Sequence, residues 1–218
     1  MAQYNVYEQE NFKTFKFSNF DEICANFGID GLIKKQCLIA PKEHKLGLRL
    51  LDLERNQLAY INQEHVEPIH DDIIARHGIF LGKCDKLQYE VAQNHNELVQ
   101  KFCHRLMAEE LGWLINFFNC IHHYLSKRIS AGKYLINHDV IRVNLAEVIE
   151  DITLVKVLLD KPATDESLHT ASKIITRALK NLGDCAGGRS FAGGNILEAF
   201  WLMTLLNQFV IGEAHNVH

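Results

Sequence analysis

The fold is decided by two neighbouring stretches, YLSKRISAGKYL at residues 124–135 and IRVNLAE at residues 141–147. Before the first stretch, apolar side chains recur at three- and four-residue steps, which places them on one broad face of a long helix. Gly132 can take a positive φ without Cβ strain and is predicted to end that helix. The second stretch lies in a helix expected from about Asp139 to Leu159, and Pro162 stops the chain from continuing it.

Two further helices are expected downstream. The first begins near Asp165 or Ser167, whose side chains can accept hydrogen bonds from the free N–H groups of the first turn, and it ends near Gly183. The second runs from about Asn195 to Ile211. Four helices joined by short links predict an antiparallel bundle over residues 95–218.

The chain upstream of the bundle has a different pattern. Residues 36–94 contain short apolar runs bounded by turn residues, at 37–40, 46–51 and 58–61, which suit the strands of a small sheet. Residues 65–77 are more polar and predict a loop or a helical turn. Residues 1–35 stay unassigned, apart from a short amphipathic candidate at 20–27. The expected fold class is α+β and mainly α, a four-helix bundle with a small N-terminal β-rich region.

The two stretches resemble a signature of acyl-CoA dehydrogenases. In these flavoenzymes a long helix ends in Tyr-x-x-x-Arg-x-x-Phe-Gly-Lys-Pro-Leu, and the next helix opens with Arg-x-x-Leu-Ala-Glu. The spacing matches without a gap, and Gly112 falls in register with a Leu-Gly pair upstream. GGRSF at 187–191 is similar to the family's Gly-Gly-x-Gly-Tyr/Phe loop. The resemblance covers residues 97–212, and more faintly 77–94, where GIFLGK and LQYEV resemble the end of the middle β-domain.

The resemblance implies a bundle like the family's C-terminal domain, a truncated middle β-domain over residues 36–94 and three flavin contacts. Arg128 stands where the family's arginine reaches the pyrophosphate of a flavin held by a neighbouring subunit, and a planar guanidinium suits phosphate oxygens. Gly187 and Gly188 stand in the loop whose backbone approaches the adenine end. The alternatives are a surface arginine that offsets the negative end of its helix, and a mobile connection between helices.

Several positions depart from the family's pattern. Ala131 replaces the phenylalanine that packs on the flavin, Tyr134 replaces a proline, and Asp139 replaces a glutamine, adding negative charge near the expected phosphate. We also expect 218 residues to leave no room for the family's helical N-terminal domain and full β-domain. FAD binding is therefore expected to be absent or weak.

The catalytic base of the family is a glutamate after the last helix, which abstracts the α-proton of an acyl thioester. A gapless alignment places Ile211 at that position, and a two-residue shift makes Glu213 the base. A minority of the family carries its base on the first bundle helix. There the alignment places Phe102, with Glu109 and Glu110 nearly two turns away. Because isoleucine cannot take a proton, Glu213 is the candidate catalytic residue.

Composition narrows the remaining function classes. A net charge of -4 with 12 neutral histidines gives no basic stripe for nucleic acid. No stretch approaches the roughly 20 apolar residues of a membrane span, and no export signal is recognised, so a cytoplasmic protein is expected. The dispersed cysteines are expected to be reduced thiols. Among the histidines, His70 and His77 with Asp72 offer the one metal option, and a polar loop is preferred, so no metal site is predicted.

Two functions follow from the resemblance. The first is a divergent acyl-CoA dehydrogenase-like protein that binds or acts on an acyl thioester of CoA or an acyl carrier protein, without classical dehydrogenase activity. The alternative is a flavin-dependent acyl-CoA dehydrogenase, as one subunit of a heteromer if a partner completes it. A homo-oligomer is expected because the family associates through this bundle and because large apolar residues crowd its helices, namely Phe117, Phe118, Phe200 and Trp201.

Overall fold

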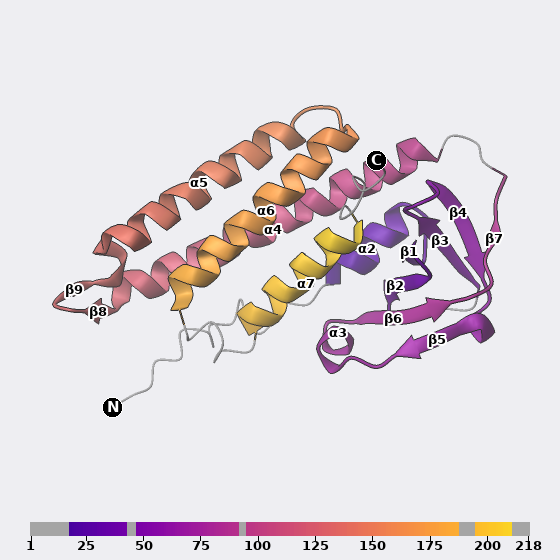
Figure 1. The fold of residues 1–218 in the computed structure, drawn as a ribbon, viewed down its shortest axis with the longest axis horizontal. Coiled ribbons are helices and arrows are strands. Elements are labelled where there is room, and N and C mark those ends of the chain that lie inside the picture. The colour runs from indigo at the N-terminus through magenta and orange to yellow at the C-terminus, as the bar shows by residue number, and fades with distance from the viewer. Residues whose placement is uncertain (1–17, 43–46, 92–94, 188–194, 211–218) are drawn as a thin grey trace. The chain divides into compact units, whose positions relative to one another are not determined.

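The computed structural model describes residues 18–42, 47–91, 95–187 and 195–210. These residues fall into two compact units that divide within one helix, between Leu106 and Met107. The first unit contains a β-sheet, and the second contains a helical bundle (Figure 1). None of the described helices combines the length and the apolar character that crossing a membrane requires.

A seven-stranded sheet forms the centre of the first unit. Its strand order is β5-β6-β2-β1-β3-β4-β7, and the neighbouring pairs are antiparallel except for β1 and β3. The strands are β1 (Gly31–Lys34), β2 (Cys37–Pro41), β3 (Leu48–Asp52), β4 (Gln57–Ile61), β5 (Val66–Ile69), β6 (Ile79–Cys84) and β7 (Gln88–Tyr89). The strands expected at 37–40, 46–51 and 58–61 are confirmed as β2, β3 and β4.

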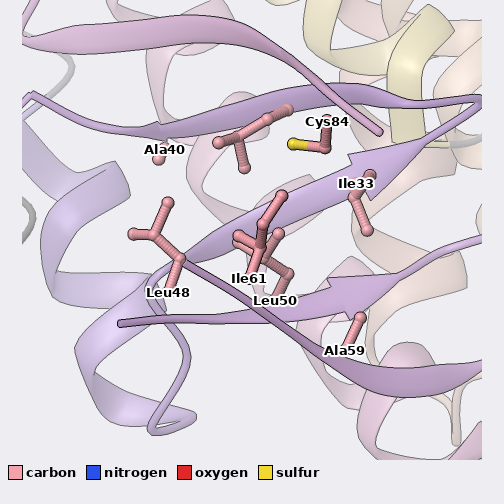
Figure 2. Close-up of a cluster of buried hydrophobic side chains, with 8 residues drawn as sticks. Ile33, Ala40, Leu48, Leu50, Ala59, Ile61 and Cys84 are labelled. Carbon is pink, nitrogen blue, oxygen red and sulfur yellow. The ribbon is translucent and has the colours of Figure 1, made fainter. Parts of the chain in front are cut away.

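The core of this unit follows the two-residue period of its strands. Every second side chain of β1 to β4 points into one cluster, which Figure 2 shows, and its members are buried: Ile33, Leu38, Ala40, Leu48, Leu50, Ala59, Ile61 and Cys84. The other side chains of these strands are largely buried too, including Leu32, Ile39 and Leu51. Strands that are buried on both faces explain why their sequence consists of continuous apolar runs.

Two strands of the sheet lie where no strand was predicted. Strand β1 falls within the unassigned segment 1–35, and it turns into β2 through Lys35 and Gln36, which both have positive φ (49° and 63°). Two-residue hairpins of this kind usually carry Asn or Gly, so the sequence gives no turn signal. Strand β5 lies in the segment expected to be a loop or a helical turn. It contains Pro68 and lies at the edge of the sheet, where proline is tolerated.

Short helices complete the first unit. Helix α2 (Ser18–Asn26) confirms the amphipathic candidate and contacts β2. Helix α3 (Asp72–Arg76) begins at Asp71, whose Oδ1 accepts hydrogen bonds from the backbone N–H groups of Ile73 and Ile74, both at 3.0 Å. A single 3-10 turn, Gln63–His65, precedes β5. The segment 65–77 therefore contains a strand as well as a helical turn.

The second unit contains the predicted bundle. Its helices are α4 (Asn96–Lys127, which begins in the first unit), α5 (Asp139–Leu159), α6 (Asp165–Ala186) and α7 (Asn195–Val210). Helix α6 starts with a capping box, in which Thr164 Oγ1 accepts from the Ser167 backbone N–H at 3.1 Å and Ser167 Oγ accepts from the Thr164 backbone N–H at 2.9 Å. The expected fold class, α+β and mainly α with a helical bundle, is confirmed.

The end of α4 differs from the prediction that Gly132 terminates it. The helix ends at Lys127, and a small hairpin follows, made of β8 (Ile129–Ser130) and β9 (Lys133–Tyr134). Ala131 and Gly132 form its two-residue turn with φ values of 49° and 78°. Gly132 was correctly expected to have a positive φ, but the residue serves the turn of a β-hairpin instead of a helix end.

Polar pairs fix the antiparallel register of α5 and α6. The Arg177 guanidinium donates to the buried Asp151 carboxylate, through Nε to Oδ2 at 3.1 Å and through Nη2 to Oδ1. One turn later on α6 and one turn earlier on α5, Asn181 Nδ2 donates to Glu147 Oε2 at 3.0 Å. Because each step of four residues along α6 matches four residues back along α5, the start of α5 lies beside the end of α6.

Candidate functional site

Arg128 follows the last residue of α4 and is held by its own helix. Its Nη1 donates to the Tyr124 hydroxyl one turn earlier, and its guanidinium lies over the Tyr124 ring, 5.1 Å from the centroid. The Leu135 backbone N–H donates to the Arg128 carbonyl at 2.7 Å, which ties the residue to the far side of the hairpin. Arg128 is thus a positioned, half-buried cation whose Nη1 is already engaged.

The hairpin beside Arg128 carries no aromatic ring at the position where the family's phenylalanine packs on the flavin. Ala131, where the family's phenylalanine packs on the ring system, is exposed and carries only a methyl group. Tyr134 is exposed on β9. Asp139 is the first residue of α5, where the helix dipole stabilises its negative charge.

Gly187 caps the C-terminus of α6. Its φ of 62° and ψ of −160° belong to a region that is open essentially to glycine alone, and its N–H donates to the Gly183 carbonyl. A Cβ built on Gly187 would meet no atom of the described residues within 4 Å. The backbone conformation therefore requires this glycine, whereas close approach to a neighbour does not.

The structure brings two of the predicted flavin-binding residues to the same end of the bundle. The hairpin after Arg128 leads into the start of α5, and α5 starts beside the end of α6, where Gly187 lies. Gly188, Ile211 and Glu213 lie outside the described residues.

A second polar point lies in the bundle core and contains Glu110. This α4 residue is fully buried, and neither of its carboxyl oxygens has a hydrogen-bond partner among the described residues. Burial raises its pKa well above the ordinary value of 4.5, while the neighbouring Asn207 amide of α7 lowers it in part. Asn207 is also buried, but the two side chains do not meet the geometry of a hydrogen bond. Asn207 is therefore a neighbour of Glu110 that leaves both groups unsatisfied.

The position of this polar pair follows from the register of α4 and α7. Phe117 and Phe200 meet edge to face with their ring centroids 5.2 Å apart. Seven residues away along each helix, in opposite directions, lie Glu110 and Asn207. Two antiparallel helices bring such positions into the same seam two turns later. This register also places Leu114 opposite Met203, so the polar pair adjoins an apolar layer.

Glu110 does not share a compact site with Arg128. The two residues are separated by 18 positions on and just beyond α4, which corresponds to about 27 Å along a helix axis. A carboxylic acid that stays protonated at neutral pH can donate a hydrogen bond or exchange a proton, and groups with strongly shifted pKa values gather at functional sites. The described bundle thus holds two separate candidate points, a cationic end and a buried acid.

The other candidate residues have structural roles or do not cluster into a site. Phe102, aligned with the alternative base, is fully buried and packs edge to face on Phe27 with centroids 5.6 Å apart. Within the described residues, no group of three His, Cys, Asp or Glu side chains could hold a metal ion. Asp71, beside the histidines of this segment, caps α3.

Comparison with known proteins gives matches among solved structures. The Tcur3481–Tcur3483 steroid ACAD is 14% identical with a TM-score of 0.63, over 85% of this chain and 59% of that one. The prolyl acyl carrier protein oxidase AnaB is 10% identical with a TM-score of 0.56, over 85% and 61%. Butyryl-CoA dehydrogenase from Megasphaera elsdenii is 13% identical with a TM-score of 0.55, over 85% and 60%. The chain shares the fold of acyl-CoA dehydrogenases.

At sequence identities of 10–14%, the similarity between this chain and the matched structures is a similarity of fold. No protein-family model matches the chain, and no curated protein matches it. The chain spans about three-fifths of the length of the matched structures. An acyl-CoA dehydrogenase fold with few identical residues leaves the chemistry to be argued from the side chains themselves.

Sequence reasoning missed the pair of Glu110 and Asn207. It placed Glu110 near an alternative base position and gave Asn207 no role. The available signal was a charged residue on the apolar face of α4, since Glu110 follows Leu106 by four residues and precedes Leu114 by four. The same rule applied to α7 identifies Asn207, which follows Met203 by four.

Proposed function

We propose that this chain is a divergent protein with an acyl-CoA dehydrogenase fold that binds or acts on an acyl thioester, of CoA or an acyl carrier protein, without classical dehydrogenase activity. The observation that carries the proposal is the fold, which matches such enzymes over about 85% of the chain. The printed names of two matched structures, butyryl-CoA dehydrogenase and prolyl acyl carrier protein oxidase, support thioesters of both kinds as ligands.

The side chains at the cationic end support the loss of classical activity. Arg128 keeps guanidinium donors other than Nη1 that can bind a phosphate, whereas the Gly187 N–H already donates to the Gly183 carbonyl. Ala131 offers no ring to pack on an isoalloxazine, and the carboxylate of Asp139 starts the helix that follows. The described residues fit a phosphate better than they fit a complete flavin. FAD binding is accordingly proposed to be weak or absent.

The alternative function is a flavin-dependent acyl-CoA dehydrogenase that acts as one subunit of a heteromer. The convergence of Arg128 and Gly187 at one end of the bundle favours it. In that case FAD supplies the hydride acceptor when bound, and Glu213 is the proposed base that takes the α-proton. Dehydrogenation of acyl thioesters by the parent, abolished in Glu213→Gln with ligand affinity unchanged, would establish this alternative.

Flavin binding separates the two functions. We expect the purified full chain to be colourless and to gain little thermal stability from FAD, because the aromatic contact at position 131 is a methyl group. A specific binder at 100 times its dissociation constant would gain about 2.7 kcal/mol. Absorption spectra and melting curves with and without FAD test this. A yellow protein, or a rise in Tm that Arg128→Gln removes and Lys133→Gln retains, would overturn the proposal in favour of the dehydrogenase.

A further inference from the structure

A cleft opens at one end of the sheet, entirely within the first unit. It lies where the β1–β2 turn, the β3–β4 turn and the segment after β6 meet, and its volume is about 710 Å³. Small-molecule sites usually occupy about 300–1,000 Å³ and combine an apolar lining with a few placed polar groups. Polar side chains form most of the lining of this cleft, and a smaller apolar part lies beside them.

The smaller, apolar part of the lining lies at the floor of the cleft. Ile33 and Cys84 belong to the buried sheet cluster, and Leu87 and Tyr89 pack against it. Figure 2 shows the Ile33 and Cys84 side chains next to each other at one side of this cluster. Burial raises the pKa of the Cys84 thiol to about 11, so the sulfur is uncharged at neutral pH. Ile33 and Cys84 are 1% and 2% exposed, so the half-buried Leu87 and Tyr89 supply the apolar surface that a hydrocarbon group can contact.

Asp52 fixes one wall of the cleft and is fully engaged in doing so. Its Oδ1 accepts from the backbone N–H groups of Glu54 at 2.9 Å and Arg55 at 3.0 Å. Its Oδ2 accepts from the Tyr89 hydroxyl at 2.9 Å. Three donors thus satisfy a 5% exposed residue, and the Tyr89 ring is held in place.

Arg55 is the unengaged cation at this wall. Its guanidinium lies over the Tyr89 ring, 4.3 Å from the centroid, and among the described residues it makes no hydrogen bond or ion pair through that group. Stacking on an aromatic ring orients a guanidinium while its N–H donors stay available for an anion. The fork of donors matches a carboxylate with two parallel hydrogen bonds.

The charges around the cleft restrict the anion that Arg55 can bind. Lys35 and Arg55 line it together with the carboxylates of Asp52, Glu54 and Asp85. Asp52 is compensated by its donors, and Glu54 accepts from the Lys35 backbone N–H at 3.0 Å. The remaining carboxylates repel a dianion more strongly than a group with one negative charge.

We propose that this cleft binds a small monoanionic amphiphile, with a carboxylate on the Arg55 guanidinium and a short hydrocarbon chain against Leu87 and Tyr89. This site is separate from Arg128 and Glu110 in the bundle. The proposal that it binds such a ligand does not depend on the function proposed above.

Titration of the full-length ¹⁵N-labelled chain with octanoate tests the site. We expect saturable amide shifts that centre on residues 33–36, 52–55 and 84–89. Arg55→Gln should weaken octanoate binding by about tenfold or more, because it removes the charged fork. Arg76→Gln, an exposed arginine of the same unit outside the cleft, should bind octanoate as the parent does.

Two further probes define the ligand class. Octanol should bind the parent about as weakly as octanoate binds Arg55→Gln, and octyl phosphate as a dianion should bind more weakly than octanoate. The absence of saturable shifts in the parent at millimolar octanoate would overturn the proposal. Shifts that centre on other residues, or equal affinity in the parent and in Arg55→Gln, would overturn it as well.

Discussion

At the scale of single residues, Glu110 has the most unusual environment of the described carboxyl groups. A carboxylic acid in an apolar seam costs free energy that a leucine would not, about 1–3 kcal/mol for each unsatisfied buried polar group. Glu110 and Asn207 place two buried polar side chains between α4 and α7, where apolar side chains would pack as well. Such a group is a candidate for function because stability does not explain it.

Glu110→Gln tests the protonation of this residue. The folded chain keeps the proton above pH 4.5, where the unfolded chain releases it, so the unfolded state binds fewer protons and stability falls as pH rises. The slope approaches about 1.4 kcal/mol per pH unit until the folded group ionises. We expect Glu110→Gln to be more stable than the parent at pH 8 and to lose this slope in urea titrations between pH 5 and 8. The neighbouring half-buried Glu109→Gln should keep the slope, and an unchanged slope in Glu110→Gln would refute the prediction.

At the scale of elements, polar pairs connect α5 and α6. Asp151 is 1% exposed, whereas the side chain of its partner Arg177 is largely exposed, so only the carboxylate depends on the pair for solvation. Because the buried Asp151 carboxylate needs Arg177 opposite it, this pair fixes the register of two helices whose apolar faces alone could slide by a turn. The same register places Gly187 beside the start of α5.

Arg177→Met should destabilise the fold by about 1–3 kcal/mol, because it leaves the buried Asp151 carboxylate without its charged donor. Chemical denaturation at pH 7 measures this effect. Lys173→Met, one turn earlier on the same helix and exposed, should change stability by less than about 0.5 kcal/mol. Equal effects of the two substitutions would show that the pair contributes nothing specific.

At the scale of the whole molecule, most exposed apolar side chains of the described bundle lie on α5, and of the residues named for self-association Trp201 is 40% exposed. Phe117 is buried against Phe200, so it is not available to a partner. Four α5 residues, Val140, Val143, Leu154 and Val157, are 42–73% exposed and lie within an arc of about 100° on the helix. This stripe consists of two apolar pairs, because the exposed Glu147 and Glu150 lie in the same arc between Val143 and Leu154. Exposed apolar groups gathered on one helix face are a candidate interface.

Self-association through this stripe remains a prediction. We expect sedimentation velocity at micromolar concentration to show a dimer or a larger oligomer, and Val143→Lys with Leu154→Lys to shift it to a monomer. Ile149→Lys provides the control, because Ile149 is also exposed but lies outside the stripe. A parent that sediments as a monomer would contradict the expected homo-oligomer.

The sequence by itself determined the elements whose signals are local. Helices α5 and α7 begin where the 3.6-residue period and flanking residues placed them, and Arg128 and Gly187 were predicted from the resemblance to the family's motifs. Only the tertiary structure decided that Ala131 adopts a positive φ in a hairpin, that β1 pairs in parallel with β3, and that Glu110 lies beside Asn207. These features depend on contacts between residues far apart in the chain. A periodic pattern shows which face of a helix or strand is buried, but the partner of that face is fixed by packing, which no single segment encodes.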